Sequence, residues 1–95
     1  MTEHELKTLP VYYDMTKRGL KPFEVRKNDR DYQAGDTLVL VRRDAWYGTS
    51  DASKLRFKIT YVLHADNPNC EIGLKPGWVV MGIEAIREAT DEQPD

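Results

Sequence analysis

The sequence lacks the features that hold secreted and membrane proteins together. Cys70 is the only cysteine, so no internal disulfide can form, and this fits a reducing cytoplasm. No run of about 18 apolar residues is present, and the first residues, MTEHELK, contain no apolar signal core. Repeats and low-complexity segments are also absent. We therefore expect a cytoplasmic protein with no membrane segment.

The length and composition fit one small domain. A chain of 95 residues buries a single modest core. Its 40% hydrophobic and 32% charged residues are typical of a globular protein and not of a disordered one. We expect one domain over residues 1–87, followed by a frayed acidic tail over residues 88–95.

The net charge of −2 conceals an uneven distribution along the chain. The tail, EATDEQPD, holds four acidic residues and no base, so the body carries 14 basic against 12 acidic residues. Residues 17–30 alone contain six basic and two acidic side chains, a local +4. Such a segment attracts phosphate, although it is also small enough to be an ordinary solvated surface. The whole-chain pI of about 5.7 argues against a strong non-specific DNA binder.

One short helix is predicted near the start of the chain, after a strand over residues 4–9. Pro10 suits a first helical turn, and Thr8 can cap it. Lys17, Arg18 and Gly19 form a stop signal, so the helix should run over residues 10–18. Val11 and Met15, four residues apart, are predicted on its inner face.

Alternating apolar residues predict the remaining strands. Phe23 and Val25 alternate with Glu24 and Arg26, the period of a half-buried strand. Apolar runs predict strands over residues 37–41 and 78–86, with Gly- and Asp-containing turns between strands. The cleanest alternation predicts one long one-sided strand with these residues on its inner face: Leu55, Phe57, Ile59, Tyr61 and Leu63. We expect a mostly β (α+β) fold, a small β-barrel of about five strands; an open α+β sheet is the alternative.

Much of the chain resembles a known family. The segment HELKTLPVYYDMTKRGLKPFEVRKNDRDYQAGDTLVL resembles the small phage and bacterial proteins grouped as DUF3850. Charged and glycine positions of that family's pattern agree here, as in His-x-Leu-Lys and Gly-x-Lys-x-Phe-Glu-x-Arg-Lys-Asn-Asp-Arg-Asp. The later segments TYVLH and GLKPGWVVMGI resemble its second half, so the match covers residues 4–84.

The resemblance implies a relation to the ASCH and PUA-like β-barrels and a cleft beside Lys21. It also implies that the protein acts in a bacterial or phage-infected cell. PUA-like relatives bind RNA, and one ASCH branch contains amidohydrolases that deacetylate acetylated cytidine. The catalytic lysine of that branch stands where Lys21 stands, but its threonine is replaced by Glu24. Its catalytic glutamate, which precedes the last strand, has its nearest counterpart in Glu71. The catalytic candidates are therefore Lys21, Glu24 and Glu71.

Residue spacing places a charged cluster at the same point of the chain. Glu24 and Arg26 should project from one face of their strand, with Lys21 at its start. Glu24 would stabilise the Lys21 ammonium, which favours binding over nucleophilic attack. The competing interpretation is a structural ion pair across the barrel. As candidate ligand-binding residues we take His4, Lys7, Lys21, Glu24, Arg26, Lys27 and Arg30.

Other groups of residues are less specific for a function. KNDRD (residues 27–31) reads as a polar turn, because a calcium loop needs more oxygen ligands and a downstream glutamate. His4, His64 and Cys70 lack the paired spacing of zinc sites, so we expect no metal and no cofactor. Aromatic side chains that could stack on a base, or instead pack in or over the barrel, are Tyr12, Tyr13, Trp46, Tyr47 and Trp78.

Three classes of function remain open from the sequence. The first is a PUA-like module that binds RNA or a nucleotide around Lys21, Glu24 and Arg26. The second is a small amidohydrolase acting on a modified nucleoside. The third is a phage-encoded protein that binds a host factor, to which the acidic tail would contribute. Fold resemblance does not decide among them, because function depends on the site.

Overall fold

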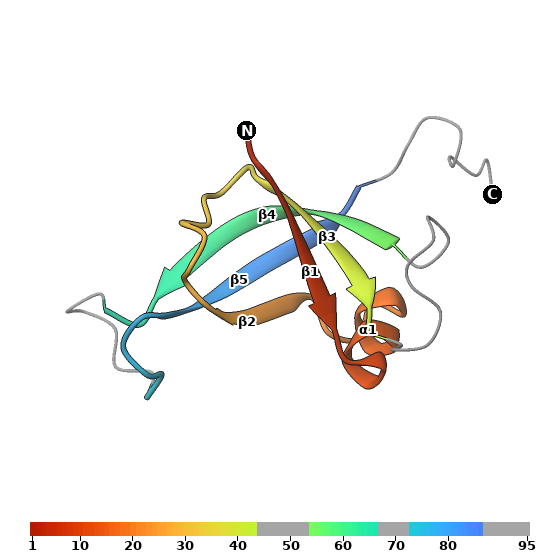
Figure 1. The fold of residues 1–95 in the computed structure, drawn as a ribbon, viewed down its shortest axis with the longest axis horizontal. Helices are drawn as coiled ribbons and strands as arrows, with labels where there is room; N and C mark the ends of the chain where they lie inside the picture. The colour runs from red at the N-terminus through yellow and green to blue at the C-terminus, as the bar shows by residue number, and fades with distance from the viewer. Residues whose placement is uncertain (44–53, 67–72, 87–95) are drawn as a thin grey trace.

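The computed structural model describes residues 1–43, 54–66 and 73–86, which form one five-stranded sheet and one helix. The elements are β1 (Glu3–Thr8), α1 (Pro10–Lys17), β2 (Phe23–Lys27), β3 (Thr37–Arg42), β4 (Lys54–His64) and β5 (Trp78–Ala85). The sheet curls into a half-barrel, and α1 lies beside the ends of β1 and β3 (Figure 1). The prediction of a mostly β fold with about five strands and one early helix is confirmed.

The strand order explains where the half-barrel is open. The order is β1-β3-β4-β5-β2; β1 pairs with β3 in parallel, and every other pairing is antiparallel. Strands β1 and β2 are therefore the two edges of the sheet, although they are neighbours in the sequence. Strand edges carry unpaired backbone groups that need other partners.

The core fills the concave side of the sheet. Its residues come from every strand except β2 and from the loop between β2 and β3, which supplies Tyr32 with 1% exposure. The cluster consists of Leu6, Tyr32, Leu38, Leu40, Phe57, Ile59, Val79, Met81 and Ile83. A small core of this kind leaves the domain sensitive to the loss of any one large side chain.

The helix begins and ends near the predicted residues but buries a different face. Pro10 occupies the first turn as expected, and Gly19, at φ 79°, follows the end of the helix. The buried residues are Tyr13 and Thr16, so the predicted inner face was wrong: Val11 is 56% and Met15 37% exposed. A helix of eight residues has too few turns for its apolar pattern to fix its orientation.

Strand β2 has the predicted period of two, and its charged face is the inner one. Phe23 and Val25 are 41% and 39% exposed, whereas Glu24 is only 2% exposed. Phe23 and Val25 therefore lie on the outer face of the strand, and Glu24 lies on the inner face. A period of two fixes which residues share a face, but not which face turns inward. The charged face turns inward because its carboxylate finds two cationic partners there.

Strand β4 is one-sided only in its first half. Phe57 and Ile59 are buried as predicted, and Arg56 is exposed on the other face. The pairing with β5 shifts between Ile59 and Tyr61, a β-bulge that moves Tyr61 to the outer face with 62% exposure. The predicted inward positions of Tyr61 and Leu63 are therefore wrong, since the bulge reverses the alternation and Val62 packs against the core instead.

Candidate functional site

A cleft of about 760 Å³ separates the two open edges of the half-barrel. One wall comes from β1 and the start of α1, and the other from β2 and the loop that follows it. Its lining among the described residues comprises Leu6, Lys7, Thr8, Leu9, Tyr12, Lys21, Phe23, Glu24, Val25, Arg26, Lys27, Asp29, Arg30, Tyr32, Arg43 and Trp78. We call this the edge cleft.

A buried carboxylate between two cations lies in the edge cleft. Glu24, whose side chain is 3% exposed, accepts a hydrogen bond from Lys21 Nζ at 2.7 Å through Oε2. Its Oε1 accepts another from Arg26 Nε at 3.0 Å. The expected convergence of Lys21, Glu24 and Arg26 is thus present, because residues 24 and 26 share the inner face of β2. A buried charge needs partners of this kind, since an unpaired carboxylate is costly to desolvate.

Arginine side chains take the place of a backbone ladder between β2 and β1. Arg26 Nη2 lies 3.2 Å from Thr8 Oγ1 and 3.3 Å from the Lys7 carbonyl oxygen. Arg30 Nη1 donates to the carbonyl oxygen of Glu5 at 2.9 Å. These bonds satisfy carbonyl groups on the open edge of β1. They also fix two guanidinium groups in the cleft. Thr8 serves this purpose and does not cap the helix, which has no side-chain cap.

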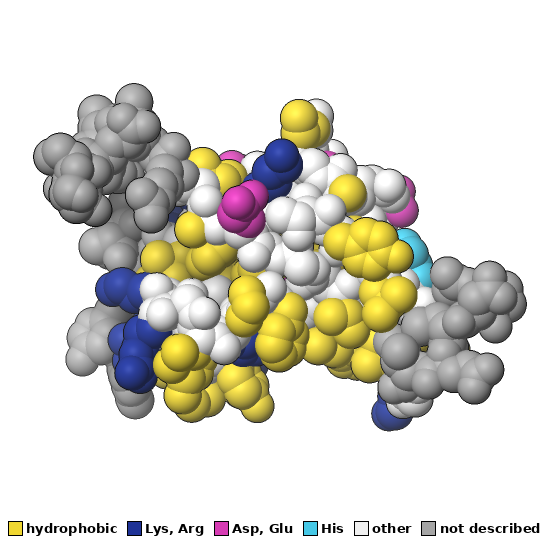
Figure 2. Space-filling model, turned by 180° about the vertical axis from the view of Figure 1, so that it is seen from behind, with side chains coloured by type: hydrophobic (Ala, Val, Ile, Leu, Met, Phe, Trp, Pro, Cys, Tyr) yellow, Lys and Arg dark blue, Asp and Glu magenta, His cyan; other side chains and the backbone are white. Residues whose placement is uncertain are grey.

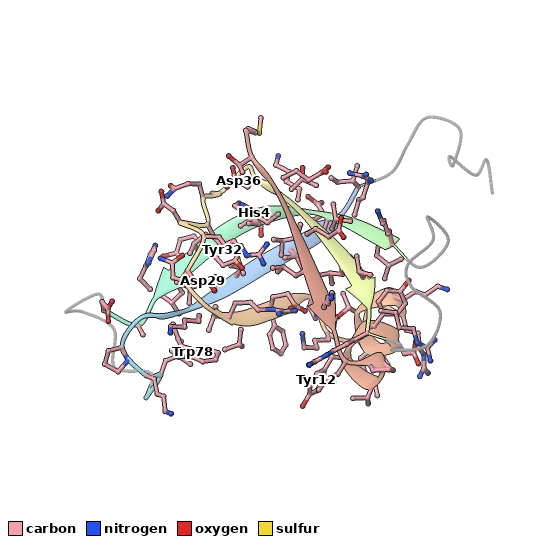
Figure 3. All side chains as sticks on the ribbon, viewed as in Figure 1. His4, Tyr12, Asp29, Tyr32, Asp36 and Trp78 are labelled. Atoms are coloured by element: carbon pink, nitrogen blue, oxygen red, sulfur yellow. The ribbon has the colours of Figure 1, made fainter. Side chains whose placement is uncertain are left out.

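Behind the cleft lies a second buried pair that fixes its back wall. His4 Nε2 and Asp36 Oδ2 are 2.9 Å apart, and Tyr32 packs edge-on against the His4 ring with centroids 4.8 Å apart. Figure 3 shows these three residues together, with Asp29 on the loop below them. Burial raises the pKa of the Tyr32 hydroxyl, so the phenol remains neutral. His4, a predicted ligand residue, is 6% exposed and reaches the cleft only through Tyr32.

Asp36 is held ionised despite its burial. Burial alone would raise its pKa, but hydrogen bonds from His4 and from the backbone N–H groups of Thr2 and Gln33 outweigh this effect and lower the pKa. The same bonds tie the amino-terminal end of the chain to the start of β3. The Asp36–His4 pair therefore stabilises the scaffold behind the cleft.

The edge cleft is strongly basic and partly aromatic. Six basic and two acidic side chains line it, a net +4 among the described residues. Lys21 Nζ lies 5.6 Å from the centre of the Tyr12 ring and 5.0 Å from that of Phe23. Tyr12 and Trp78 mark two separated ends of the lining, one on α1 and one at the start of β5 (Figure 3). A cleft with these properties suits a ligand that carries negative charge and a flat apolar ring.

A second cavity of about 770 Å³ lies between α1 and the ends of β4 and β5, and shares Lys21 with the edge cleft. Two of its cations are already paired outside it: Lys54 lies 3.7 Å from Glu5, and Arg56 pairs with Glu3. No buried carboxylate is found among its described lining residues. The edge cleft is therefore the better candidate site.

Most predicted ligand residues line the edge cleft, namely Lys7, Lys21, Glu24, Arg26, Lys27 and Arg30. Sequence reasoning missed Thr8, Tyr32 and Arg43; a tyrosine inside a polar turn was a signal for the second of these. Several predictions concern residues outside the described ranges, namely those for Trp46, Tyr47, Cys70, Glu71 and the tail.

The predicted polar turn of residues 27–31 (KNDRD) is present: Asn28 Oδ1 accepts a hydrogen bond from the Tyr32 backbone N–H. Within residues 1–43, 54–66 and 73–86, no group of three or more possible metal ligands occurs.

No helix in the described part of the chain is long and apolar enough to cross a membrane. The fold is similar to that in the crystal structure of hypothetical protein PH0355, with a TM-score of 0.59 and 19% sequence identity. That likeness covers 90% of this chain and 100% of the other, and it concerns the fold alone.

Two sequence comparisons found similar proteins, and one of them shows the family. An uncharacterized 12.9 kDa protein in the GpA 3′ region of Escherichia phage P2 is 49% identical over 37 residues, which are 39% of this chain. The match spans only 34% of the phage protein's length. The model of a domain of unknown function, DUF3850, matches residues 3–83, which include all five strands up to Ile83 and the whole edge cleft. This chain therefore belongs to the DUF3850 family.

Proposed function

We propose that this protein binds a nucleotide unit, either free or within single-stranded RNA, in the edge cleft. The observation that carries the proposal is the Glu24 carboxylate, held between Lys21 and Arg26 in a cleft of net charge +4. Phosphate, base and ribose each find a matching group there. The ASCH and PUA-like resemblance of the sequence points to the same class of ligand.

The phosphate would bind the two guanidinium groups on the seam between β1 and β2. Arg26 uses Nε and Nη2 for its contacts within the protein, whereas Arg30 uses Nη1 and has Nε 3.9 Å from Asp29 Oδ1. Each guanidinium has further N–H groups that can face a ligand. Because both side chains are already held in place, little conformational entropy is lost when they bind phosphate.

The base would stack on the exposed aromatic rings and meet Glu24. Tyr12 is 50% and Phe23 41% exposed, and Trp78 is half-buried. Stacking of a base on an aromatic side chain contributes about 1–3 kcal/mol and tolerates many sequences. Each carboxylate oxygen of Glu24 accepts one described hydrogen bond, which leaves acceptor capacity for an N–H group on the edge of a base.

The amidohydrolase alternative receives less support from the same geometry. A nucleophilic lysine needs a free amine, usually produced by an apolar pocket or a cationic neighbour. Lys21 Nζ instead donates to Glu24 and to the carbonyl oxygen of Phe23, at 2.7 and 2.8 Å. In both contacts Nζ acts as a hydrogen-bond donor to an oxygen, which is the role of a binding group and not of an attacking amine. Binding is therefore the function that we propose.

Titration with a short single-stranded RNA tests the proposal. An oligonucleotide of about eight bases spans one site of this size. Fluorescence anisotropy at about 50 mM salt should detect binding by the wild type and at least tenfold weaker binding by Lys21→Ala and Arg26→Ala. Lys58→Ala is the matched control, since it removes one exposed positive charge away from the cleft. Mononucleotides in the same assay separate a free nucleotide from RNA as the ligand. Failure of the wild type to bind either probe, or an equal loss in the control, contradicts the proposal.

A further inference from the structure

The second cavity, between α1 and the ends of β4 and β5, is lined by a polar group that the fold leaves unsatisfied. Thr16 on α1 lines this cavity and is only 4% exposed. Its hydroxyl oxygen, Oγ1, is buried and has no hydrogen-bond partner in the described part of the chain. A threonine in a helix often donates to the carbonyl oxygen four residues earlier, but Thr16 does not. Because a buried hydroxyl without a partner is unfavourable, this one is available to a group that enters the cavity.

The turn that follows α1 uses its own backbone groups and leaves the Thr16 hydroxyl aside. Gly19 N–H donates to the carbonyl oxygen of Thr16 at 3.1 Å, and Leu20 N–H donates to that of Met15 at 3.0 Å. Gly19 has a φ of 79°, which permits this closure of the helix end. The end of α1 is therefore complete without the hydroxyl, which has no structural role in the turn.

The walls of the second cavity are basic. Its described lining residues include no acidic side chain and four basic ones, Lys17, Lys21, Lys54 and Arg56. Figure 2 shows Lys and Arg side chains gathered beside α1, the helix that forms one wall. The pairs of Lys54 with Glu5 and of Arg56 with Glu3 lie at the surface. Ion pairs of this kind are weak, so a phosphate can compete for both cations.

Lys21 joins the second cavity to the edge cleft, because it lines both. A lysine side chain has three N–H donors. Two of those of Lys21 are used within the protein, by the Phe23 carbonyl oxygen and by Glu24 Oε2. The third can donate to an anion that lies between the two cavities. Nine basic side chains line the two cavities together, so one basic surface extends from the edge cleft past Lys21.

The second cavity suits the backbone of a nucleic acid better than a base. Phe57, the one aromatic residue of its described lining, is 7% exposed and packs in the core, where no base can stack on it. No carboxylate or amide side chain occurs in that lining to recognise the edge of a base. Cations bind phosphate whatever the base. A hydroxyl can donate to a phosphate oxygen or accept from a ribose hydroxyl.

We propose that the second cavity binds the phosphate and sugar of the nucleotide next to the one in the edge cleft. The ligand is then a single RNA strand of two or more units, with the phosphate that links them at Lys21 and the Thr16 hydroxyl bonded to the second unit. This inference rests on the proposed function and goes further, since a free mononucleotide fills only one of the two cavities. Their volumes, about 760 and 770 Å³, are each within the range of small-ligand sites.

Competition against the labelled eight-base RNA tests the inference. The competitors are 5′-phosphorylated RNAs of one, two and four units, each of uniform sequence and made with each of the four bases, at about 50 mM salt. For the base that binds most tightly, the dinucleotide should bind at least tenfold more tightly than the mononucleotide, because it adds contacts in the second cavity. Four units should add less than the second unit does, since both cavities are then filled.

Variants of the second cavity test which residues supply this gain. Lys17→Ala and Thr16→Val should each reduce the advantage of the dinucleotide over the mononucleotide about fivefold, because neither residue lines the edge cleft. Lys58→Ala is the matched control: it removes one exposed charge that lines neither cavity and should keep the full advantage. Thr16→Val should also raise the melting temperature by about 2–5 °C, since it replaces an unpartnered buried hydroxyl with a methyl group of similar shape.

The outcomes separate this inference from the proposed function. Equal affinity for one, two and four units overturns the inference and leaves nucleotide binding in the edge cleft intact. A wild type that does not bind the labelled RNA overturns both. A dinucleotide advantage that survives Lys17→Ala, or that Lys58→Ala reduces equally, places the second unit elsewhere. A Thr16→Val variant with a lowered melting temperature shows that the hydroxyl has a partner within the protein, and this overturns its assigned role.

Discussion

The guanidinium of Arg26 connects the buried carboxylate of Glu24 to the opposite edge of the sheet. Its Nε lies 3.0 Å from Glu24 Oε1, and its Nη2 lies 3.2 Å from Thr8 Oγ1 on β1. The same contacts that would hold a ligand therefore also close the seam of the half-barrel. Changes at Glu24 should affect binding and stability together, whereas changes at Lys21 should separate them.

Glu24→Ala should lower the free energy of unfolding by about 2–3 kcal/mol, because it leaves Lys21 and Arg26 close together without their shared carboxylate. Lys21→Ala should cost only about 1 kcal/mol, since Glu24 keeps Arg26 and the Lys21 side chain is 18% exposed. Urea unfolding of the two variants measures both values. Equal losses would mean that Glu24 has no special role on the seam.

Phe57→Ala should cost about 3–5 kcal/mol, enough to threaten a domain of this size, because Phe57 is 7% exposed in the core. Lys58→Ala, one residue further along β4, should be nearly neutral since Lys58 is exposed. Thermal melts of the pair check this prediction. Similar melting temperatures for the two variants would refute the assigned faces of β4.

The number and order of the elements along the chain were accessible from the sequence, but the orientation of several was not. Alternation identified β2 and β4, because a strand has a period of two whichever face is buried. It could not reveal the bulge between Ile59 and Tyr61, where a Cβ on Gly82 of the neighbouring strand would lie 2.8 Å from Thr60 Oγ1. It also left open whether Phe23 or Glu24 turns inward, since a period of two does not say which face is buried.

Stability should fall in acid through Asp36. Its pKa in the folded protein lies below the ordinary value of 3.8, so the ionised form stabilises the fold above that pH. This contribution is lost as the pH falls below 3.8 and through the lowered folded pKa. Asp36→Asn removes it at every pH. The difference in unfolding free energy between wild type and variant should be constant near neutral pH and shrink in acid. A difference that grows in acid contradicts the assignment.

RNA affinity should depend on salt through the cations of the edge cleft. Raising salt from about 50 to 200 mM should weaken binding steeply, because condensed counterions are released from the phosphates. Lys27→Ala should reduce the slope of log affinity against log salt by about one unit. The slope of Lys58→Ala should equal that of the wild type. Equal slopes for wild type and Lys27→Ala would place the phosphate elsewhere.

The charged centre of the site was predictable, and its surroundings were not. Lys21, Glu24 and Arg26 lie within six residues, so spacing along one strand was enough to group them. Thr8 and Tyr32 join them only because the edges β1 and β2 meet across the open side of the half-barrel. The position of these two edges depends on the strand order of the sheet, which is determined by pairing between strands far apart in the sequence. His4 was grouped with the ligand residues by resemblance, but its partner is Asp36, 32 residues away.

Mapping of backbone amide chemical shifts during titration with the short RNA tests the central claim most directly, since it locates the ligand as well as detecting it. The account predicts concentration-dependent shifts for Lys7, Arg26, Lys27 and Arg30 around the edge cleft. The amide shifts of the exposed outer face of β4, such as that of Lys58, should not change. Saturable shifts confined to the edge cleft would support nucleotide binding there. No shifts at low salt, or shifts centred away from the cleft, would contradict it.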